Sequence, residues 1–337
     1  MDKTTRDIIL GLQPAKLVLK HASVIHVHDC TIEVADIAIH KGKIAGVGEY
    51  SGIKEVDCTG LFVAPGFIDG HVHIESSMLT PSRFAALVLP FGTTSVIADP
   101  HEIANVCGVE GLRFMIEDAK RANLDIHFMI PSCVPATPFE TAGGKIRVQD
   151  IQAWKQKKKV LGLGEVMDYP SVLSLEPTMM AKIKTMNSRV IDGHAPSLQG
   201  KELSLYHAIG IQTDHEAITQ EEAKERVKIG MYVHLRQGSQ TQNVLDLLPA
   251  VTPDNHHRFL FCSDDYHPAD ILAKGHINHH VNLAIEFGIP PMHAIRMATI
   301  NAATCYGLHD VGSIEVGKQA NFILFDSLTH IVPKAVY

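Results

Sequence analysis

Two histidines separated by a single residue stand at the end of an apolar run in the first quarter of the chain. Residues 66–68 lead through Asp69 to His71 and His73. On a β-strand, residues i and i+2 point to the same side, so this spacing presents two imidazoles to one point in space. Two ring nitrogens offered in this way suit a metal ion. In a chain with 21 histidines such a pair can also arise by chance, so the remaining sequence must decide.

The overall composition is that of an ordinary globular protein, with 45% hydrophobic and 20% charged residues among 337. A net charge of −7 without a long run of like charges argues against nucleic acid as a partner. Six scattered cysteines without a C-x-x-C pair favour reduced thiols and a cytoplasmic location. No apolar run approaches about 18 residues and the N-terminus lacks a signal-peptide pattern, so we expect no membrane association.

The elements that must position the two histidines are eight short apolar strands that alternate with helices. The expected strands are 67–73, 94–99, 126–131, 160–165, 190–194, 211–215, 231–235 and 259–264. Helices are expected between them at 81–89, 108–121, 148–158, 176–186, 201–209, 220–229 and 241–248, and two longer helices follow at 269–287 and 292–306. This alternation predicts an α/β fold, specifically a parallel (β/α)8 barrel of the TIM type.

Strand-like sequence also flanks this series at both ends of the chain. Short apolar stretches fill residues 15–63, with Lys41-Gly42 as a tight hairpin turn, and the same texture returns at 312–314 and 321–325. We therefore expect a small β-sandwich-type domain built from both termini. The predicted organisation is 1–63 for its first part, 64–308 for the barrel and 309–337 for the return to the small domain, which we expect to be incomplete.

Polar residues of a few types stand, one after another, at the carboxyl ends of the expected strands. In a parallel barrel these ends meet at one face, where the active sites of such barrels lie. In chain order the ends present His71 and His73, His101 and Glu102, Glu165, His194, His215 and Glu216, Arg236, and Asp264. One such histidine would more often be a packed core residue, but packing does not account for the joint pattern.

Four imidazoles and two carboxylates are more ligands than one tetrahedral metal ion requires. A pair of divalent ions, bridged by a carboxylate and a water molecule, would use all of them. Such a pair would lower the pKa of the bridging water, so that hydroxide is available at neutral pH. An aspartate that ligates one ion can also accept the proton of that water, and this role fits Asp264.

At these positions the chain resembles the amidohydrolase superfamily, which has such a barrel, a His-x-His on the first strand and an aspartate on the eighth. Within that superfamily it is similar to the adenine deaminases over nearly the whole barrel. The matching stretches are PGFIDGHVHIESSMLTPSRFA (65–85), FGTTSVIADPHEIANVCG (91–108), PSCVPATPFETAG (131–143), LGLGEVM (161–167), VIDGHAPSLQGKEL (190–203), DHE (214–216) and FCSDDYHP (261–268). Glu165 stands where many members carry a carbamylated lysine, which argues against the hydantoinase and dihydroorotase branches.

The resemblance implies hydrolytic deamination of adenine to hypoxanthine and ammonia, a reaction of purine salvage or catabolism. It also implies two divalent metal ions, with Mn²⁺ or Fe²⁺ preferred and Zn²⁺ as an alternative, and a homo-oligomer. Carried over position by position, the metal ligands are His71, His73, Glu165, His194, His215 and Asp264. A metal-bound hydroxide would attack C6 of adenine, and Asp264 would carry the proton to the leaving amine.

Further residues are implicated around these ligands. A second acid must protonate a ring nitrogen of adenine, and the sequence does not rank its three candidates. They are Glu216, His101 and Glu102. A metal-bound imidazole usually donates its other N–H to an acceptor, and three aspartates are placed for that role. They are Asp69, Asp192 and Asp214.

Two features depart from the adenine deaminase pattern. Gln237 stands where we expect a glutamate, which would change the charge near the substrate. The family continues beyond IVPKAVY, where this sequence stops, so we expect dimer contacts or a lid from that further region to be missing. Two alternatives therefore stay open: the same scaffold acting on another purine-like or cyclic amidine substrate, and a shortened, inactive homologue with a binding role.

Overall fold

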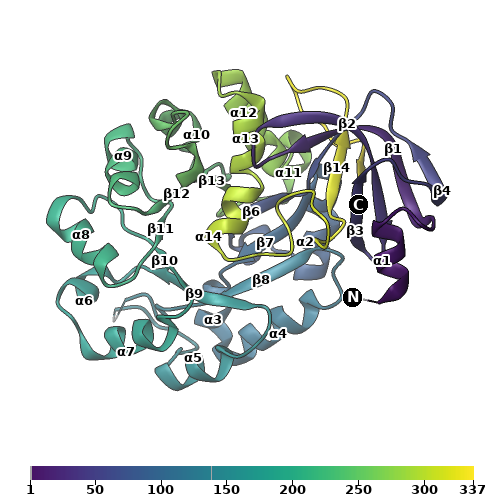
Figure 1. Ribbon diagram of the computed structural model, residues 1–337. Coiled ribbons are helices and arrows are strands. Elements are labelled where there is room, and N and C mark those ends of the chain that lie inside the picture. The colour runs from purple at the N-terminus through teal and green to yellow at the C-terminus, as the bar shows by residue number, and fades with distance from the viewer. Residues whose placement is uncertain (1, 138) are drawn as a thin grey trace.

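The computed structural model describes residues 2–137 and 139–337, and eight parallel strands form a barrel through its middle (Figure 1). The strands are β6 (Phe67–Val72), β7 (Thr93–Ala98), β8 (Asp125–Ile130), β9 (Val160–Val166), β10 (Val190–Gly193), β11 (Thr213–Asp214), β12 (Tyr232–Arg236) and β13 (Phe259–Cys262). Hydrogen bonds join β6 to β10 in chain order as one sheet, and β11 to β13 as another.

Two seams join these sheets into the barrel. At one seam, the N–H of Gln212 donates to the carbonyl of Ile191 at 3.0 Å. At the other, the N–H of Asp264 donates to the carbonyl of His71 at 2.9 Å, and the N–H of His73 donates to the carbonyl of Asp264 at 3.1 Å. The second seam therefore places the ends of the first and eighth barrel strands side by side. The predicted α/β barrel is confirmed.

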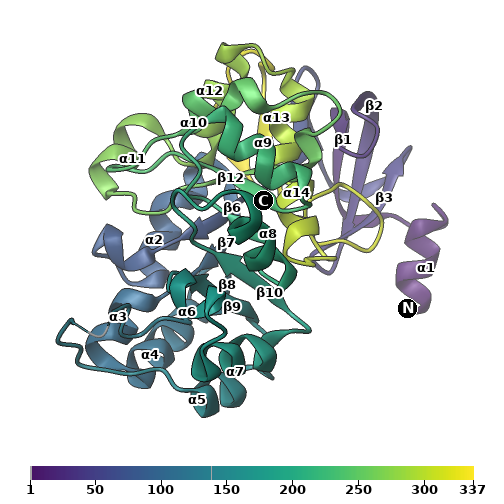
Figure 2. The same ribbon diagram turned by 90° about the vertical axis from the view of Figure 1, so that its left-hand side faces the viewer.

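Helices cover the outside of the barrel (Figures 1 and 2). The longer ones are α2 (Pro81–Val88), α4 (Val109–Ala119), α7 (Pro177–Met186), α8 (Gly200–Ala208), α9 (Gln220–Lys228) and α12 (Ile277–Phe287). The shorter ones are α3 (His101–Cys107), α5 (Val148–Trp154), α6 (Tyr169–Leu173), α10 (Val244–Leu247), α11 (Pro268–Lys274), α13 (Pro291–Met297) and α14 (Ile300–Cys305), with η1 (Ile74–Ser77), η2 (Leu89–Phe91), η3 (Leu248–Ala250) and η4 (His256–Arg258) as 3₁₀ turns. No helix among the described residues combines the length and hydropathy needed to cross a bilayer.

Local sequence explains where several helices begin and end. The Thr219 hydroxyl accepts from the N–H of Glu222, whose carboxylate accepts from the N–H of Thr219, and this reciprocal cap starts α9. The prediction of two long unbroken helices at 269–287 and 292–306 was wrong. Gly275, at φ +105°, ends α11 before α12 begins, because a left-handed residue terminates a helix whatever the apolar periodicity around it.

A seven-stranded sheet beside the barrel contains residues from both ends of the chain (Figure 1). It contains β1 (Ala15–His26), β2 (Thr31–His40), β3 (Lys43–Gly48), β4 (Gly52–Asp57), β5 (Phe62–Pro65), β14 (Phe322–Phe325) and β15 (Ala335–Val336), and α1 (Lys3–Ile9) precedes it. β14 pairs antiparallel with β5, so the C-terminal segment returns to the N-terminal one. The hairpin turn at Lys41-Gly42 is present, with both residues at positive φ, whereas no strand forms at 312–314. The boundaries at 63/64 and 308/309 stay a prediction.

An apolar cluster joins several barrel strands to a helix. Ile68, Ile97, Met129 and Leu260 come from four different strands and pack together with Ala302 of α14. This apolar plug fixes the strands relative to one another, so the residues at their carboxyl ends are held on a rigid base.

Candidate metal centre

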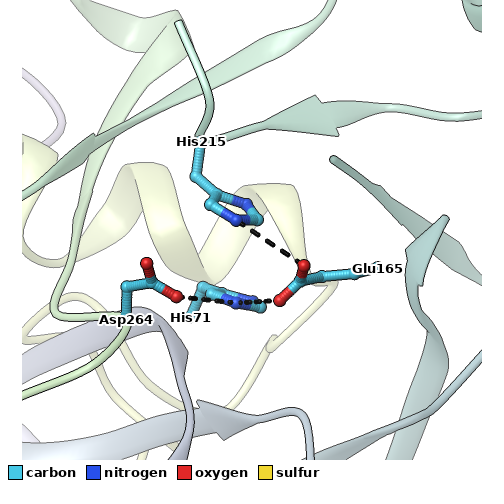
Figure 3. A group of neighbouring side chains, drawn as sticks. All are labelled: His71, Glu165, His215 and Asp264. Carbon is cyan, nitrogen blue, oxygen red and sulfur yellow. Dashed lines mark ion pairs between the residues drawn. The ribbon is translucent and has the colours of Figure 1, made fainter. Parts of the chain in front are cut away.

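All six predicted metal ligands converge at the carboxyl ends of the barrel strands. Figure 3 shows four of them: dashed lines join Glu165 to His71 and to His215, and Asp264 lies on the other side of His71 from Glu165. His73 follows His71 at the start of η1, and His194 directly follows β10. The structure therefore brings together side chains from five strand ends that span almost 200 residues of sequence.

The first group of donor atoms surrounds Oε1 of Glu165. This oxygen lies 2.9 Å from Nε2 of His71 and 2.8 Å from Nε2 of His73, and the two nitrogens are 3.0 Å apart. Oδ1 of Asp264 lies 3.1 Å from Nε2 of His73. Separations near 3 Å suit ligands of one ion, because metal–nitrogen and metal–oxygen bonds are about 2.0–2.2 Å long.

The second group surrounds the other oxygen of the same carboxylate. Oε2 of Glu165 lies 2.7 Å from Nδ1 of His194 and 3.8 Å from Nε2 of His215. Glu216 approaches both rings, with its Oε1 3.3 Å from Nε2 of His215 and 3.6 Å from Nδ1 of His194. Glu165 thus contacts both groups, one with each oxygen, as a bridging carboxylate would.

Charge and burial at the two groups also fit divalent cations. Glu165 and Asp264 are 2% and 6% exposed. Burial opposes their ionisation, but the neighbouring imidazoles hold the pKa of both carboxyls well below the usual range. Oε1 of Glu165 and Nδ1 of His194 lie close to these polar atoms, but neither forms a hydrogen bond of acceptable geometry with a described residue. Imidazole and carboxylate donors of this kind fit Mn²⁺, Fe²⁺ or Zn²⁺ without selecting among them.

Asp99, directly after β7, holds residues that belong to two other strand ends, those of β6 and β9. Nδ1 of His73 lies 2.8 Å from the carbonyl oxygen of Asp99, which only accepts, so this nitrogen carries the proton and leaves Nε2 as the free donor atom. The carboxylate of Asp99 accepts from the N–H of Glu165 at 2.8 Å. One residue therefore fixes the tautomer of His73 and the backbone of Glu165.

The prediction that three aspartates accept hydrogen bonds from the ligand imidazoles was wrong. Asp69 accepts instead from the N–H and hydroxyl of Ser263, next to Asp264. Asp192 accepts from the hydroxyl of Thr213 at 2.9 Å.

Asp214 likewise binds backbone and not an imidazole. It accepts from the N–H of Ala195 at 2.9 Å, next to His194, and from Nε of the fully buried Arg226 at 2.6 Å. Each of these carboxylates thus bonds a residue of another strand, close in sequence to a candidate ligand of that strand.

The predicted second-acid candidates lie on two sides of the donor groups. Glu216 contacts the guanidinium of Arg236, which also donates to Oδ2 of Asp264 at 2.8 Å. No role for Arg236 follows from the sequence, although its place at the end of the seventh strand matches that of the candidate ligands. On the opposite side, Nε2 of His101 lies 3.6 Å from Oε1 of Glu102, and Oε2 of Glu102 lies 3.7 Å from Nδ1 of His73.

A cleft of about 410 Å³ opens over these residues. Met167 and Ile218 add apolar surface to its otherwise polar wall, and its size suits a small-molecule ligand. Gln237 is not among the residues that line it; its N–H donates to the carbonyl of Cys262 within the barrel wall.

Comparison with known proteins places this geometry in a family. A model described as the amidohydrolase family matches residues 62–337. The chain belongs to the amidohydrolase family. This family is metal-dependent, and the convergent histidines and carboxylates form the candidate metal-binding cluster of this member.

Curated relatives of this amidohydrolase are named adenine deaminases. Adenine deaminase 2 of Carboxydothermus hydrogenoformans is 46% identical over 331 residues, which is 98% of this chain and 58% of the relative. Adenine deaminase 2 of Desulfotalea psychrophila is 49% identical over 328 residues, which is 96% of this chain and 56% of the relative. The chain thus spans a little more than half the length of the curated relatives it matches.

Solved structures with low sequence identity share the fold. A crystal structure of an adenine deaminase aligns with a TM-score of 0.69 at 17% identity, covering 92% of this chain and 90% of that chain. A β-aspartyl dipeptidase from Fervidobacterium islandicum aligns with a TM-score of 0.68 at 18% identity, covering 95% of this chain and 94% of that chain. Both likenesses support the amidohydrolase barrel.

Proposed function

We propose that this amidohydrolase hydrolyses adenine to hypoxanthine and ammonia with the help of two divalent metal ions, Mn²⁺ or Fe²⁺ by preference and Zn²⁺ as the alternative. The observation that carries the proposal is Glu165, whose two carboxylate oxygens approach different imidazoles, Oε1 those of His71 and His73 and Oε2 those of His194 and His215. The curated relatives, 46% and 49% identical and named adenine deaminases, support the choice of substrate.

Each candidate histidine ligand is assigned to one of the two ions by the Glu165 oxygen that it approaches. His71, His73, Asp264 and Oε1 of Glu165 would hold one ion, and His194, His215 and Oε2 of Glu165 would hold the other. When bound, such a pair supplies Lewis acidity and lowers the pKa of a coordinated water. The surrounding residues orient the substrate and move its protons.

Asp264 is the group we assign to proton transfer between water and the leaving amine. Its backbone adopts the left-handed conformation, φ +57°, and is held there by the paired hydrogen bonds to His71 and His73. This conformation directs its carboxylate into the cleft, where Arg236 binds Oδ2. We assign to Asp264 the removal of a proton from the attacking water and its delivery to the nitrogen that leaves C6.

Glu102 is the residue we assign to ring-nitrogen protonation. Glu216 contacts the Arg236 guanidinium, and this contact suits a residue that positions the substrate and does not donate a proton. Oε2 of Glu102 has no hydrogen-bond partner among the described residues, and the side chain is 37% exposed at the cleft. His101 stands beside it at the mouth. A Glu102→Gln variant is expected to lower kcat without changing metal content, whereas unchanged kcat would exclude this assignment.

The direct test is release of hypoxanthine and ammonia from adenine by the purified chain reconstituted with Mn²⁺ or Fe²⁺. Turnover that disappears in Asp264→Asn and survives in His330→Gln, a matched change at an exposed histidine, supports the proposal. Two bound ions without adenine turnover would move the assignment to another purine-like or cyclic amidine substrate. Failure to bind any ion would contradict the metal centre itself.

A further inference from the structure

His234 lies in the barrel interior without a hydrogen-bond partner for either ring nitrogen among the described residues. It belongs to β12 and is 1% exposed. Because side chains alternate along a strand, His234 points to the same side as Arg236 but one layer deeper, beneath the candidate metal centre. Its ring centre lies 6.5 Å from that of His71 and 6.4 Å from that of His215. Buried polar atoms in native proteins almost always bind a protein group or an ordered water.

His71, in the candidate metal centre above, also has an unpartnered ring nitrogen. Its Nε2 faces Glu165 and Asp264, while Nδ1 is buried and has no partner in the described part of the chain. A metal-binding imidazole normally donates its second N–H to an acceptor, which fixes the tautomer. His73 has such an acceptor in the carbonyl of Asp99, so His71 differs from its neighbour in this respect.

We propose that a buried water molecule links Nδ1 of His71 to His234, and that His234 is thereby a positioning residue for His71. The inference rests on the proposed metal centre. Two hydrogen bonds of about 2.9 Å in series span at most roughly 5.8 Å between nitrogens, which suits rings whose centres are 6.5 Å apart. Tyr306, with its ring centre 6.1 Å from that of His234, brings a further hydroxyl oxygen to this layer.

The link sets which nitrogen of His71 carries the proton. The water accepts from Nδ1–H of His71 and donates to a ring nitrogen of His234, so Nε2 of His71 keeps its lone pair toward Glu165 and Asp264. An apolar residue at 234 would remove this acceptor and let the proton move to Nε2, where it opposes metal binding. Loss of such an outer partner typically weakens metal affinity by about 10–100-fold.

The test compares His234→Leu with His234→Gln by titrating the metal-free proteins with Mn²⁺ and by measuring their thermal unfolding without metal. We expect the Kd for Mn²⁺ to rise about 10–100-fold in the leucine variant and to stay near the wild-type value in the glutamine variant, which keeps donor and acceptor atoms. The metal-free leucine variant should unfold near the wild-type temperature, because leucine fills the buried space of the imidazole while the hydrogen bonds through the water are lost.

His127→Leu is the matched control, since His127 is also buried with an unpartnered Nδ1 but contacts Asp125 near the opposite end of its strand. Its Kd for Mn²⁺ should not change. Wild-type affinity in His234→Leu would overturn the inference and leave the metal centre standing. Equal loss of affinity in the leucine and glutamine variants, with both metal-free proteins destabilised, would make His234 merely structural. A wild-type chain that binds no Mn²⁺ would overturn the proposed function and the inference together.

Discussion

Two layers of polar side chains lie at the top of the barrel, and their bonding differs. The ligand layer consists of His71, His73, Glu165, His194, His215 and Asp264. The aspartate layer consists of Asp69, Asp99, Asp192 and Asp214. In the ligand layer, atoms that can bind a metal lie close together: the Nε2 atoms of His71 and His73 are 3.0 Å apart, and Oε1 of Glu165 finds no hydrogen donor among the described residues. In the aspartate layer, the carboxylates accept backbone, hydroxyl or guanidinium hydrogens.

This difference indicates that the ligand layer serves metal binding and that the aspartate layer serves the stability of the fold. Each aspartate fixes a residue on a different strand: Asp99 holds the N–H of Glu165, and Asp214 holds the N–H next to His194. The ligand layer can therefore keep unpaired atoms aimed at common points because the layer around it supplies the rigidity. Changes in the ligand layer should abolish metal binding and leave the fold intact, whereas changes in the aspartate layer should act on the free energy of unfolding.

The largest effect is expected from Glu165→Gln. The amide removes the charge that both groups of imidazoles share and places an N–H₂ against their ring nitrogens, so the chain should lose its pair of ions and all measurable turnover. Its metal-free unfolding midpoint should stay near that of the wild type, because the amide removes an Oε1 that lacks a hydrogen donor but also gives up the attraction between the carboxylate and the neighbouring imidazoles.

Elemental analysis and thermal unfolding check this prediction, with Glu221→Gln in the exposed first turn of α9 as the control that keeps both ions. If Glu165→Gln retained two ions, Glu165 would not be needed for metal binding. A strongly lowered midpoint without metal would contradict the expectation that changes in the ligand layer leave the fold intact.

Arg226→Met should give the opposite result. Arg226 is fully buried, binds Oδ2 of Asp214 through Nε at 2.6 Å and donates to the carbonyl of Ala195 at 2.8 Å. Removing it leaves the Asp214 charge buried and uncompensated, which typically costs about 3–5 kcal/mol of the free energy of unfolding. Urea unfolding measures this loss.

The control for this variant is Arg258→Met, where the guanidinium donates to the carbonyl of Gly230 and lies 4.8 Å above the ring centre of Tyr232. Its cost should stay near about 1 kcal/mol. If the two variants lost similar free energies of unfolding, the ion pair between Arg226 and Asp214 would stabilise the fold no more than an ordinary hydrogen bond.

The sequence predicted the convergence of the candidate ligands better than the hydrogen-bond partners of the aspartate layer, and the reason is geometric. Each ligand directly ends an apolar strand, and parallel strands bring their ends to one face whatever the details of register. The bonding partners of Asp69, Asp192 and Asp214 depend on which backbone atoms of the neighbouring strand lie opposite, and the sequence does not encode that register locally. The imidazole partners predicted for them were therefore wrong, although the carboxylates themselves do hold the site together.

The barrel strands could be predicted because each is a short apolar run between turn residues. β9 was expected at 160–165 and forms at Val160–Val166. Helix continuity was less predictable: the apolar periodicity of 269–287 continues across Gly275, whose φ of +105° breaks the helix. Arg236 was missed as a partner of Glu216 and Asp264 because a guanidinium at a strand end does not reveal from sequence which carboxylates it reaches.

The smallest effect is expected from Tyr306→Phe, which tests how redundant the aspartate layer is. The Tyr306 hydroxyl lies 3.0 and 3.1 Å from the two oxygens of Asp192, and Asp192 also accepts from the hydroxyl of Thr213. Because one donor remains, the loss should be about 1.5 kcal/mol in urea unfolding, with metal affinity nearly unchanged.

Tyr50→Phe is the matched control, because it removes a hydrogen bond to the carbonyl of Ile9 in the region of the terminal sheet, away from both layers. Its cost should be about 1 kcal/mol. If Tyr306→Phe lowered the free energy of unfolding as much as Arg226→Met, Asp192 would depend on the Tyr306 hydroxyl alone. The other bonds of the aspartate layer would then not compensate for the loss of one. A loss equal to that of Tyr50→Phe would mean that the bonds of this layer are ordinary ones, and that its rigidity comes from their number.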